Sequence, residues 1–125
     1  MRAAILGAGS IALRTARLLL GQGHEVIIVD PDKERIDALA EQIDCGLIHG
    51  DGSKPLVLRD LDPARTDVLF CLSNNDQTNI LASLVGRSLG FARVVTRIED
   101  PEFEHICMEL GLEETVIPAR AISRV

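Results

Sequence analysis

Six short apolar runs, separated by segments with helical spacing, constrain the fold of this 125-residue chain more than any other feature of its sequence. The runs are AAILGA, EVIIVD, GLIHG, DVLFCLS, ARVVTRI and ETVIP, and they carry the β-branched residues that favour strands. Between them, KERIDALAEQI repeats apolar residues from Ile36 to Ile43 at helical spacing. A second helical segment, QTNILASLVGRSLG, ends at Gly90, where a helix C-cap belongs.

Apolar strands that alternate with helices predict a parallel sheet covered on both faces, because each crossover between parallel strands lays a helix on one face. We therefore expect a Rossmann-like, doubly wound α/β fold with a six-stranded, mainly parallel sheet and helices on both faces. A chain of this length has room for one compact domain, and no repeat or linker divides it. Residues 1–125 are expected to form that single domain.

Polar residues mark three expected helix starts. Asp100 and Ser53 each precede a proline by one or two positions, which is typical of an N-cap followed by proline in the first turn. Asn74 with Gln77 resembles a capping box at the start of the helix after the fourth run. Capping alone is a sufficient role for these side chains, so evidence of function must come from what the helix ends face.

Two glycines one residue apart interrupt the first apolar run. Gly7, Gly9 and Ala12 form a GxGxxA pattern directly after an expected strand and at the start of an expected helix, the context in which this pattern binds dinucleotides. Gly7 would permit a tight turn, Gly9 would let a pyrophosphate approach the backbone, and Ala12 would keep the helix close to the strand. Free N–H groups and the positive end of the helix dipole would then face the anion. The glycines alone are also compatible with a purely structural turn.

Asp30 supplies an acidic group where such a site needs one. It ends the second apolar run, about 20 residues beyond the glycines, where a carboxylate can accept hydrogen bonds from both hydroxyls of an adenosine ribose. The same carboxylate would repel a 2′-phosphate, so a ribose without one is expected, although Arg35 could offset the repulsion. Asp32 could assist Asp30, but it is expected to cap the helix that begins near Lys33. Together, GxGxxA and Asp30 predict an adenine-nucleotide site.

Composition excludes several classes of function. The net charge of −6 and the pI near 5.0 argue against binding to nucleic acid or directly to lipid, which needs basic patches. Three widely spaced cysteines fit neither a disulfide framework nor a metal clip, which favours a reduced, cytoplasmic setting. No signal peptide or spanning helix is expected, because the glycines interrupt the N-terminal apolar stretch early.

A small NAD-dependent oxidoreductase domain without its substrate domain is the alternative interpretation. Hydride transfer usually needs a positioned acid or base, and the absence of tyrosine rules out a Tyr-Lys catalytic pair. His49 is the one tempting base, but a lone histidine is more often structural. The other histidines and the cysteines have no partners at metal-ligand or nucleophile-base spacing. We therefore expect no catalytic residue and no metal site.

Three longer stretches resemble one family in both order and spacing. They are VDPDKERIDALAEQIDCGLIHGDGSKPLVLRD, DVLFCLSNNDQTNILASLVGRSLG and ARVVTRIEDPEFEHICMELGLEETVIPARAI. The family is the regulator of potassium conductance (RCK) family, whose nucleotide-binding lobes are also called KTN or TrkA-N domains. Its more distinctive pieces here are Gly50-Asp51, the turn 73–76 leading to Thr78-Asn79-Ile80, and RIEDP at 97–101. The resemblance covers nearly the whole chain.

The resemblance implies a cytosolic regulatory subunit or domain that binds NAD(H) or ATP/ADP and controls a membrane potassium channel or transporter. It also implies a homodimer or larger ring, held at the inner face of the cell membrane through that partner. By motif position, Asp51 and Gly52 would lie near the adenine, or Asp51 would serve only to form a turn. Ser73 and Asn74 would lie by the phosphates or second ribose, or act only as caps.

Arg97, by the same resemblance, would approach a phosphate or a subunit contact, unless it is a surface ion-pair partner. The expected cofactor-binding residues are Gly7, Ala8, Gly9, Ser10, Ile11, Asp30, Pro31, Asp51, Gly52, Ser73, Asn74 and Arg97.

The chain departs from the family pattern in three respects. Ala12 replaces the third glycine, a tolerated change, and Glu99 stands where relatives often carry an amide. Family members usually continue through a crossover helix into a second lobe, whereas this sequence stops at PARAISRV, so we expect it to be a fragment of a longer protein. From Pro118 onwards the crossover would expose Ala119, Ile122 and Val125, which favours self-association.

Overall fold

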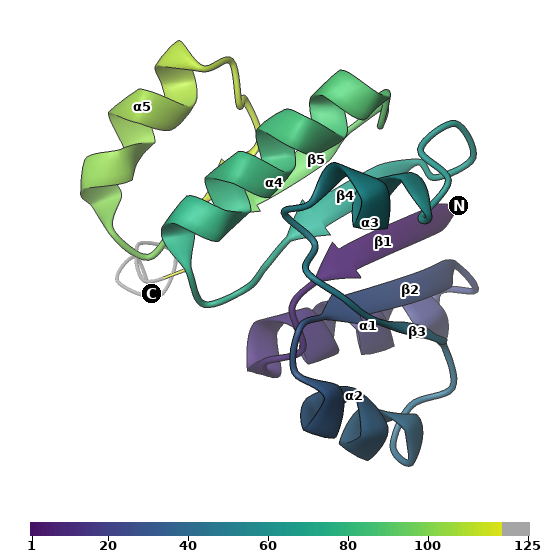
Figure 1. Ribbon diagram of the computed structural model, residues 1–125. Coiled ribbons are helices and arrows are strands. Elements are labelled where there is room, and N and C mark those ends of the chain that lie inside the picture. The colour runs from purple at the N-terminus through teal and green to yellow at the C-terminus, as the bar shows by residue number, and fades with distance from the viewer. Residues whose placement is uncertain (119–125) are drawn as a thin grey trace.

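A six-stranded sheet forms the centre of the computed structural model, which describes residues 1–118 (Figure 1). The strands are β1 (Arg2–Leu6), β2 (Glu25–Asp30), β3 (Gly46–His49), β4 (Val68–Cys71), β5 (Val94–Arg97) and β6 (Thr115–Val116). The helices are α1 (Ser10–Gly21), α2 (Lys33–Ala40), α3 (Pro55–Arg59), α4 (Asp76–Leu89), the short 3₁₀ helix η1 (Pro101–Phe103) and α5 (Glu104–Glu109). All six predicted strands are present.

The strands lie in the order β3-β2-β1-β4-β5-β6, and every neighbouring pair is parallel. The predicted doubly wound α/β fold is confirmed, with a sheet that is wholly rather than mainly parallel. The chain winds outward from β1 to β3, then returns to place β4 on the other side of β1. The loops after β1 and β4 therefore diverge and open a crevice at the carboxyl ends of these strands, where α/β folds bind ligands.

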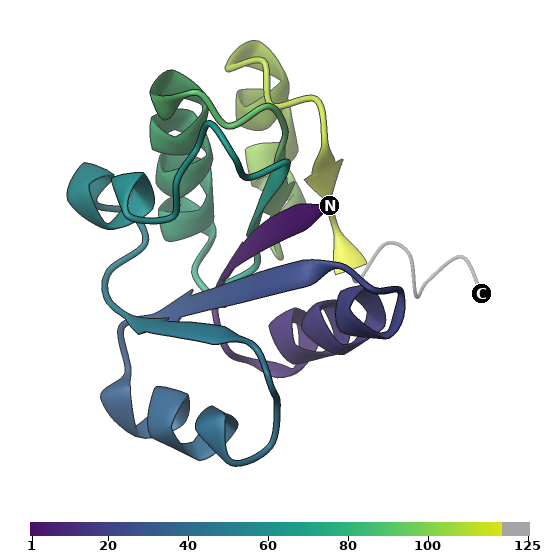
Figure 2. The ribbon, with the colours of Figure 1, turned by 90° about the vertical axis from the view of Figure 1, so that its right-hand side faces the viewer.

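Alternation along β1 divides the core between the two faces of the sheet. Ala3 and Ile5 pack on one face with α1 and α2, while Ala4 and Leu6 pack on the other with α3 and α4. Figure 2 shows the two helical layers on opposite sides of the sheet. A smaller cluster around Cys107 joins α5 to α4 and to Ile117, the residue after β6. Both faces are thus buried, which explains why the strands are apolar along their length.

Three helix ends agree with the sequence. Asp32 caps α2 by accepting hydrogen bonds from the backbone of Glu34 and Arg35, and Asp100 caps η1. Gly90 ends α4 at a φ of 101°, a left-handed conformation that glycine adopts at little cost. These are positions where a local pattern sets the local structure.

Three other helix boundaries differ from the prediction. The N-cap of α4 is Asn75 rather than Asn74, and its side chain accepts from the Thr78 N–H. The N-cap of α3 is Lys54 rather than Ser53, because the residue before a proline favours an extended conformation. Helix α2 ends at Ala40 instead of reaching Ile43.

Cys71 is wholly buried in the core, as its apolar neighbours predict. Within residues 1–118 no helix combines the length and hydropathy needed to cross a membrane. The apolar residues expected to drive self-association, Ala119, Ile122 and Val125, lie outside the described residues.

Candidate functional site

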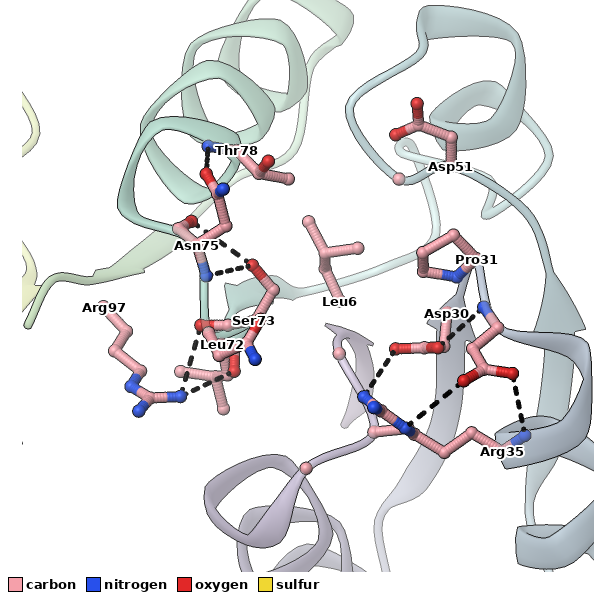
Figure 3. A pocket seen from close by; sticks show the side chains of 16 residues that line it. Leu6, Asp30, Pro31, Arg35, Asp51, Leu72, Ser73, Asn75, Thr78 and Arg97 are labelled. Atoms are coloured by element: carbon pink, nitrogen blue, oxygen red, sulfur yellow. Dashed lines mark hydrogen bonds and ion pairs between the residues drawn. The ribbon is translucent and has the colours of Figure 1, made fainter.

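A pocket of about 300 Å³ opens where the loops after β1, β2, β3, β4 and β5 converge (Figure 3). Every residue predicted to bind a cofactor lines this pocket except Ser10 and Ile11, which occupy the first turn of α1. Segments that are far apart in the sequence therefore meet at one place, the crevice between β1 and β4. The roles of these residues toward a ligand remain predictions.

The turn after β1 depends on Gly7. Its φ is 113°, and its N–H donates to the Val29 carbonyl at 2.8 Å, which ties the turn to β2. A Cβ atom at this position would lie 2.9 Å from the backbone nitrogen of Ser73. Gly9, the N-cap of α1, has open space around it, and Ala12 is wholly buried against the core. Backbone and ligand can therefore approach each other closely at Gly9, as the GxGxxA pattern predicts.

Asp30 ends β2 with its side chain almost completely buried. Its Oδ2 accepts a hydrogen bond from the Asp32 N–H at 2.9 Å, which fixes the carboxylate. Arg35 reaches back from the first turn of α2, with Nη1 3.9 Å from the Asp30 Oδ1 and Nε 4.0 Å from the Asp32 Oδ2 (Figure 3). Half-exposed Arg35 thus places a positive charge beside the carboxylate predicted to bind ribose.

Asp51 follows β3 and forms its own turn. Its Oδ1 accepts hydrogen bonds from the Ser53 hydroxyl at 2.6 Å and the Ser53 N–H at 2.9 Å, and these bonds lower the pKa of the Asp51 carboxyl. At the next residue, Gly52, any side chain would overlap with Leu6. The pocket wall at this point is consequently a backbone segment packed on β1, with the Asp51 carboxylate beside it.

The wall after β4 is held by a buried amide. Asn79 of α4 accepts from the N–H and hydroxyl of Ser73 through its Oδ1, at 3.0 and 2.7 Å. Its Nδ2 donates to the carbonyls of Ser73 and Arg97, at 2.9 and 3.0 Å. The N–H and hydroxyl proton of Ser73, which a phosphate would otherwise accept, are thus already donated inside the protein.

Arg97 ends β5 and lies against the same wall. Its Nη1 donates to the carbonyls of Leu72 and Ser73, each at 3.2 Å. On its other side, Nε and Nη2 donate to Glu99 Oε1 at 3.2 and 2.5 Å. Arg97 thus lines the pocket and is the ion-pair partner of Glu99, and its approach to a phosphate or a subunit contact stays a prediction.

The pocket also contains residues outside the set of expected cofactor-binding residues, namely Leu6, Asp32, Arg35, Leu72, Asn75 and Thr78; of these, Asp32 and Arg35 are expected neighbours of Asp30. Leu6 and Leu72 adjoin predicted residues and could have been included on position alone. Thr78 lies in a family-like motif, but its place at the pocket follows from the entry angle of α4, which no local pattern gives. The tempting base His49 is outside the pocket wall, and its Nε2 donates to the Pro31 carbonyl at 2.9 Å.

The chemical character of the site is that of a binding pocket with both charge signs. Three carboxylates, from Asp30, Asp32 and Asp51, face two guanidinium groups, from Arg35 and Arg97. Over residues 1–118 the structure holds no cluster of three metal-ligating side chains. Ribose hydroxyls can donate hydrogen bonds to the carboxylates, while backbone N–H groups at the start of α1 can donate hydrogen bonds to phosphate oxygens.

The family and sequence comparisons agree with this geometry. The TrkA-N domain model matches residues 3–118. A Trk system potassium uptake protein TrkA homolog from Archaeoglobus fulgidus is 35% identical over 103 residues, covering 82% of this chain and 23% of that protein. Another TrkA homolog, from Methanothermobacter thermautotrophicus, is 25% identical over 120 residues, covering 96% of this chain and 56% of that protein. The chain thus spans less than two thirds of the length of these relatives.

Solved structures share the fold. The NAD(P)-binding domain of an exopolyphosphatase-related protein from Archaeoglobus fulgidus superposes with a TM-score of 0.88 at 21% identity, covering 98% of this chain and 91% of that one. The GsuK structure bound to ADP gives 0.87 at 22% identity, covering 98% and 32%. The GsuK channel bound to NAD gives 0.82 at 22% identity, covering 92% and 21%.

Proposed function

Because this chain belongs to the TrkA-N domain family, we propose that it is a nucleotide-sensing regulatory domain that controls potassium flux through a membrane channel or transporter. The observation that carries the proposal is the meeting of the Gly7-to-Gly9 turn with Asp30 in one pocket at the switch point of the sheet. A turn of this kind binds a diphosphate through its backbone N–H groups, and a carboxylate at the end of β2 accepts hydrogen bonds from the ribose hydroxyls.

The proposed ligand is NAD(H) or ATP/ADP. Both kinds of ligand contain an adenosine and a diphosphate, which Asp30, Pro31 and the N-terminus of α1 would hold. GsuK, which shares the fold, has been solved with NAD and with ADP, and this supports the same ligand class here. The adenine would lie toward Asp51 and Gly52, while Ser10 and Ile11 would contribute backbone N–H groups from the first turn of α1.

Regulation requires that a ligand bind two conformations with unequal affinity. The candidate ligands differ at the end remote from adenosine, which we place at Ser73, Asn74 and Arg97. These residues belong to the loops after β4 and β5, and Asn79 ties both loops to α4. A change at the far end of the ligand would therefore act on the position of α4.

We propose binding without turnover, in preference to the alternative of an oxidoreductase domain. His49, the side chain considered as a base, donates its Nε2 proton to a carbonyl and lies off the pocket wall. Hydride transfer would need a substrate pocket beside the nucleotide, and the residues 1–118 supply the nucleotide-binding sheet itself. The chain would thus carry the sensor of a larger assembly.

The proposed assembly is a homodimer or larger ring on the inner face of the membrane, in contact with a pore-forming subunit. The curated relatives are named potassium uptake proteins, which supports this partner class, and they are longer than this chain. Contact with the membrane would be through that partner, because a chain with a net charge of −6 is poorly suited to anionic lipid.

Two experiments test the proposal. Denaturing the purified chain and identifying any released nucleotide by mass spectrometry names the ligand, and calorimetry with NADH, ATP and ADP measures its affinity. In the full-length protein, Gly9→Val should abolish the nucleotide response of potassium uptake, because the new side chain occupies the space a pyrophosphate needs.

Gly21→Val, at the other end of α1, is the matched control, since neither glycine has a neighbour within 4 Å of an added Cβ. The control should respond to nucleotide as the wild type does. An unchanged response in Gly9→Val, or a wild type that binds none of the three nucleotides, would remove the proposed function.

A further inference from the structure

The ion pair between Arg97 and Glu99 lies at the end of the pocket assigned to the remote part of the nucleotide. The Arg97 side chain is 14% exposed and the Glu99 side chain 47%. Arg97 lines the pocket, whereas Glu99 approaches the guanidinium from outside the pocket wall. Arg97 therefore faces the pocket, while Glu99, its ion-pair partner, faces solvent.

Four of the five N–H donors of the Arg97 guanidinium are already engaged. Two bonds from Nη1 go to main-chain carbonyls of Leu72 and Ser73, and the bonds from Nε and Nη2 go to Glu99. The two carbonyls belong to the loop after β4, so these bonds hold the guanidinium against the pocket wall. The fifth donor is on Nη2, the nitrogen that also binds Glu99, so a phosphate that takes two N–H groups from this side of the guanidinium must compete with Glu99.

The backbone of Glu99 is held by a residue of α4. Asp76, the first residue of that helix, accepts hydrogen bonds from the backbone N–H of Glu99 at 2.9 Å and of Asp100 at 3.0 Å. The Glu99 side chain can turn away from Arg97, but its backbone stays next to the pocket. A carboxylate displaced by a phosphate would remain close to it, and the two negative charges would repel each other.

Charge elsewhere in the site does not compensate. With Glu99 included, the pocket region carries four carboxylates and two guanidinium groups, so the described residues that line it offer no surplus positive charge for a further phosphate. The helix terminus at α1 serves the diphosphate next to adenosine and its influence fades within a turn. A nucleotide whose remote end is an uncharged ribose and ring avoids the exchange at Arg97 altogether.

On the basis of the proposed function, we propose that Glu99 is a specificity-determining residue of this site. By occupying Arg97, it disfavours nucleotides that bring a terminal phosphate to this end of the pocket and favours dinucleotides such as NADH. The class of ligand that Glu99 favours is thus a diphosphate flanked by two nucleosides rather than a nucleoside triphosphate.

Removal of the charge with retention of shape tests the inference. Calorimetry on the 125-residue chain in metal-free buffer with EDTA compares wild type with Glu99→Gln, using NADH, ATP and AMP as ligands. Glu99→Gln should raise ATP affinity by about tenfold relative to NADH, which corresponds to about 1.4 kcal/mol. AMP is too short to reach Arg97, so its affinity should stay the same.

Glu102→Gln, an exposed glutamate three residues on, makes the same change in net charge away from Arg97 and is the matched control. It should leave the ratio of ATP to NADH affinity unchanged. The inference is overturned if Glu99→Gln binds NADH but has the wild-type ratio, if AMP gains as much as ATP, or if Glu102→Gln gives the same gain. A wild type that binds none of these nucleotides would instead show that the proposed function itself is wrong, and the inference with it.

Discussion

Asn79 encloses the backbone of Ser73: the amide oxygen accepts from the Ser73 N–H and hydroxyl, and the amide nitrogen donates to the Ser73 carbonyl. The remaining Asn79 donor bonds the Arg97 carbonyl. One wholly buried side chain on α4 therefore links the loop after β4 to the end of β5. A buried polar group that makes its hydrogen bonds adds rigidity, whereas one left without partners is costly.

Asn79→Ala should lower the free energy of unfolding by about 3 kcal/mol, because it leaves buried donors and acceptors without partners. Chemical denaturation followed by circular dichroism measures the change. Gln77→Ala, at an exposed position on the same helix, is the control and should stay within about 0.5 kcal/mol of wild type. Equal effects of the two substitutions would contradict a stabilising role for the Asn79 hydrogen bonds.

The two glycines of the first turn should behave differently when each is replaced by alanine. Gly7→Ala should cost about 1–3 kcal/mol in backbone strain alone, with more from the overlap with Ser73. Gly9→Ala should cost at most about 1 kcal/mol, as a poor N-cap in open space. Thermal and urea unfolding of both variants without ligand make the comparison. A Gly9→Ala variant as unstable as Gly7→Ala would be inconsistent with this turn.

Asp30→Ala should weaken NADH binding by roughly 1.5–3 kcal/mol, the cost of losing hydrogen bonds from ribose to a charged group. Titration calorimetry measures the loss. Asp37→Ala removes an exposed carboxylate from α2 and should bind NADH like the wild type. If Asp30→Ala retains full affinity, the ribose does not contact this carboxylate.

NADPH should bind more weakly than NADH, because the 2′-phosphate would meet the Asp30 carboxylate. Arg35 lies 3.9 Å from that carboxylate and offsets part of the repulsion. Arg35→Ala should therefore lower NADPH affinity more than NADH affinity and widen the preference. Competition titrations check both statements, and equal affinities in the wild type would overturn them.

The cysteines should differ sharply in reactivity at pH 8. Burial raises the pKa of Cys71 to about 12, so its thiol stays protonated there, and the group is wholly inaccessible. Burial also raises the pKa of Cys45 and of Cys107, but Cys45 is only partly buried. Alkylation mapped by mass spectrometry should modify Cys45 first, and Cys71 only on unfolding. Rapid alkylation of Cys71 in the native chain would contradict its placement in the core.

Local patterns were sufficient to predict the fold because each strand and several helix ends carry their own signal. The six apolar runs, the cap at Asp32 and the left-handed Gly90 depend on neighbouring residues alone. The errors at helix starts are of one or two residues. Helix α3 starts after Lys54, the residue before Pro55, while the Ser53 hydroxyl bonds Asp51, and the cap of α4 is Asn75, which accepts from the Thr78 N–H.

The position of the pocket could be predicted from the sequence, but the hydrogen bonds and ion pairs of its side chains could not. The sequence places Arg97 at the end of a strand, yet only the tertiary structure shows that two main-chain carbonyls and Glu99 occupy its donors. Arg35 likewise reaches the site through the angle at which α2 leaves β2, and that angle is set by packing on the sheet. The chemistry of a residue type can be inferred locally, whereas its availability to a ligand depends on what the fold brings beside it.

In a wholly parallel sheet, all the strands end at one side of the molecule and begin at the opposite side. Every loop that lines the pocket follows a strand, so the turns that precede strands, such as 22–24, 60–67 and 90–93, lie at the opposite edge. A fluorophore, an affinity tag or an inserted reporter domain can be attached there without entering the ligand space. Gln22, exposed in the first of these turns and with a φ of −91°, offers a convenient attachment point for following α1 from outside the site.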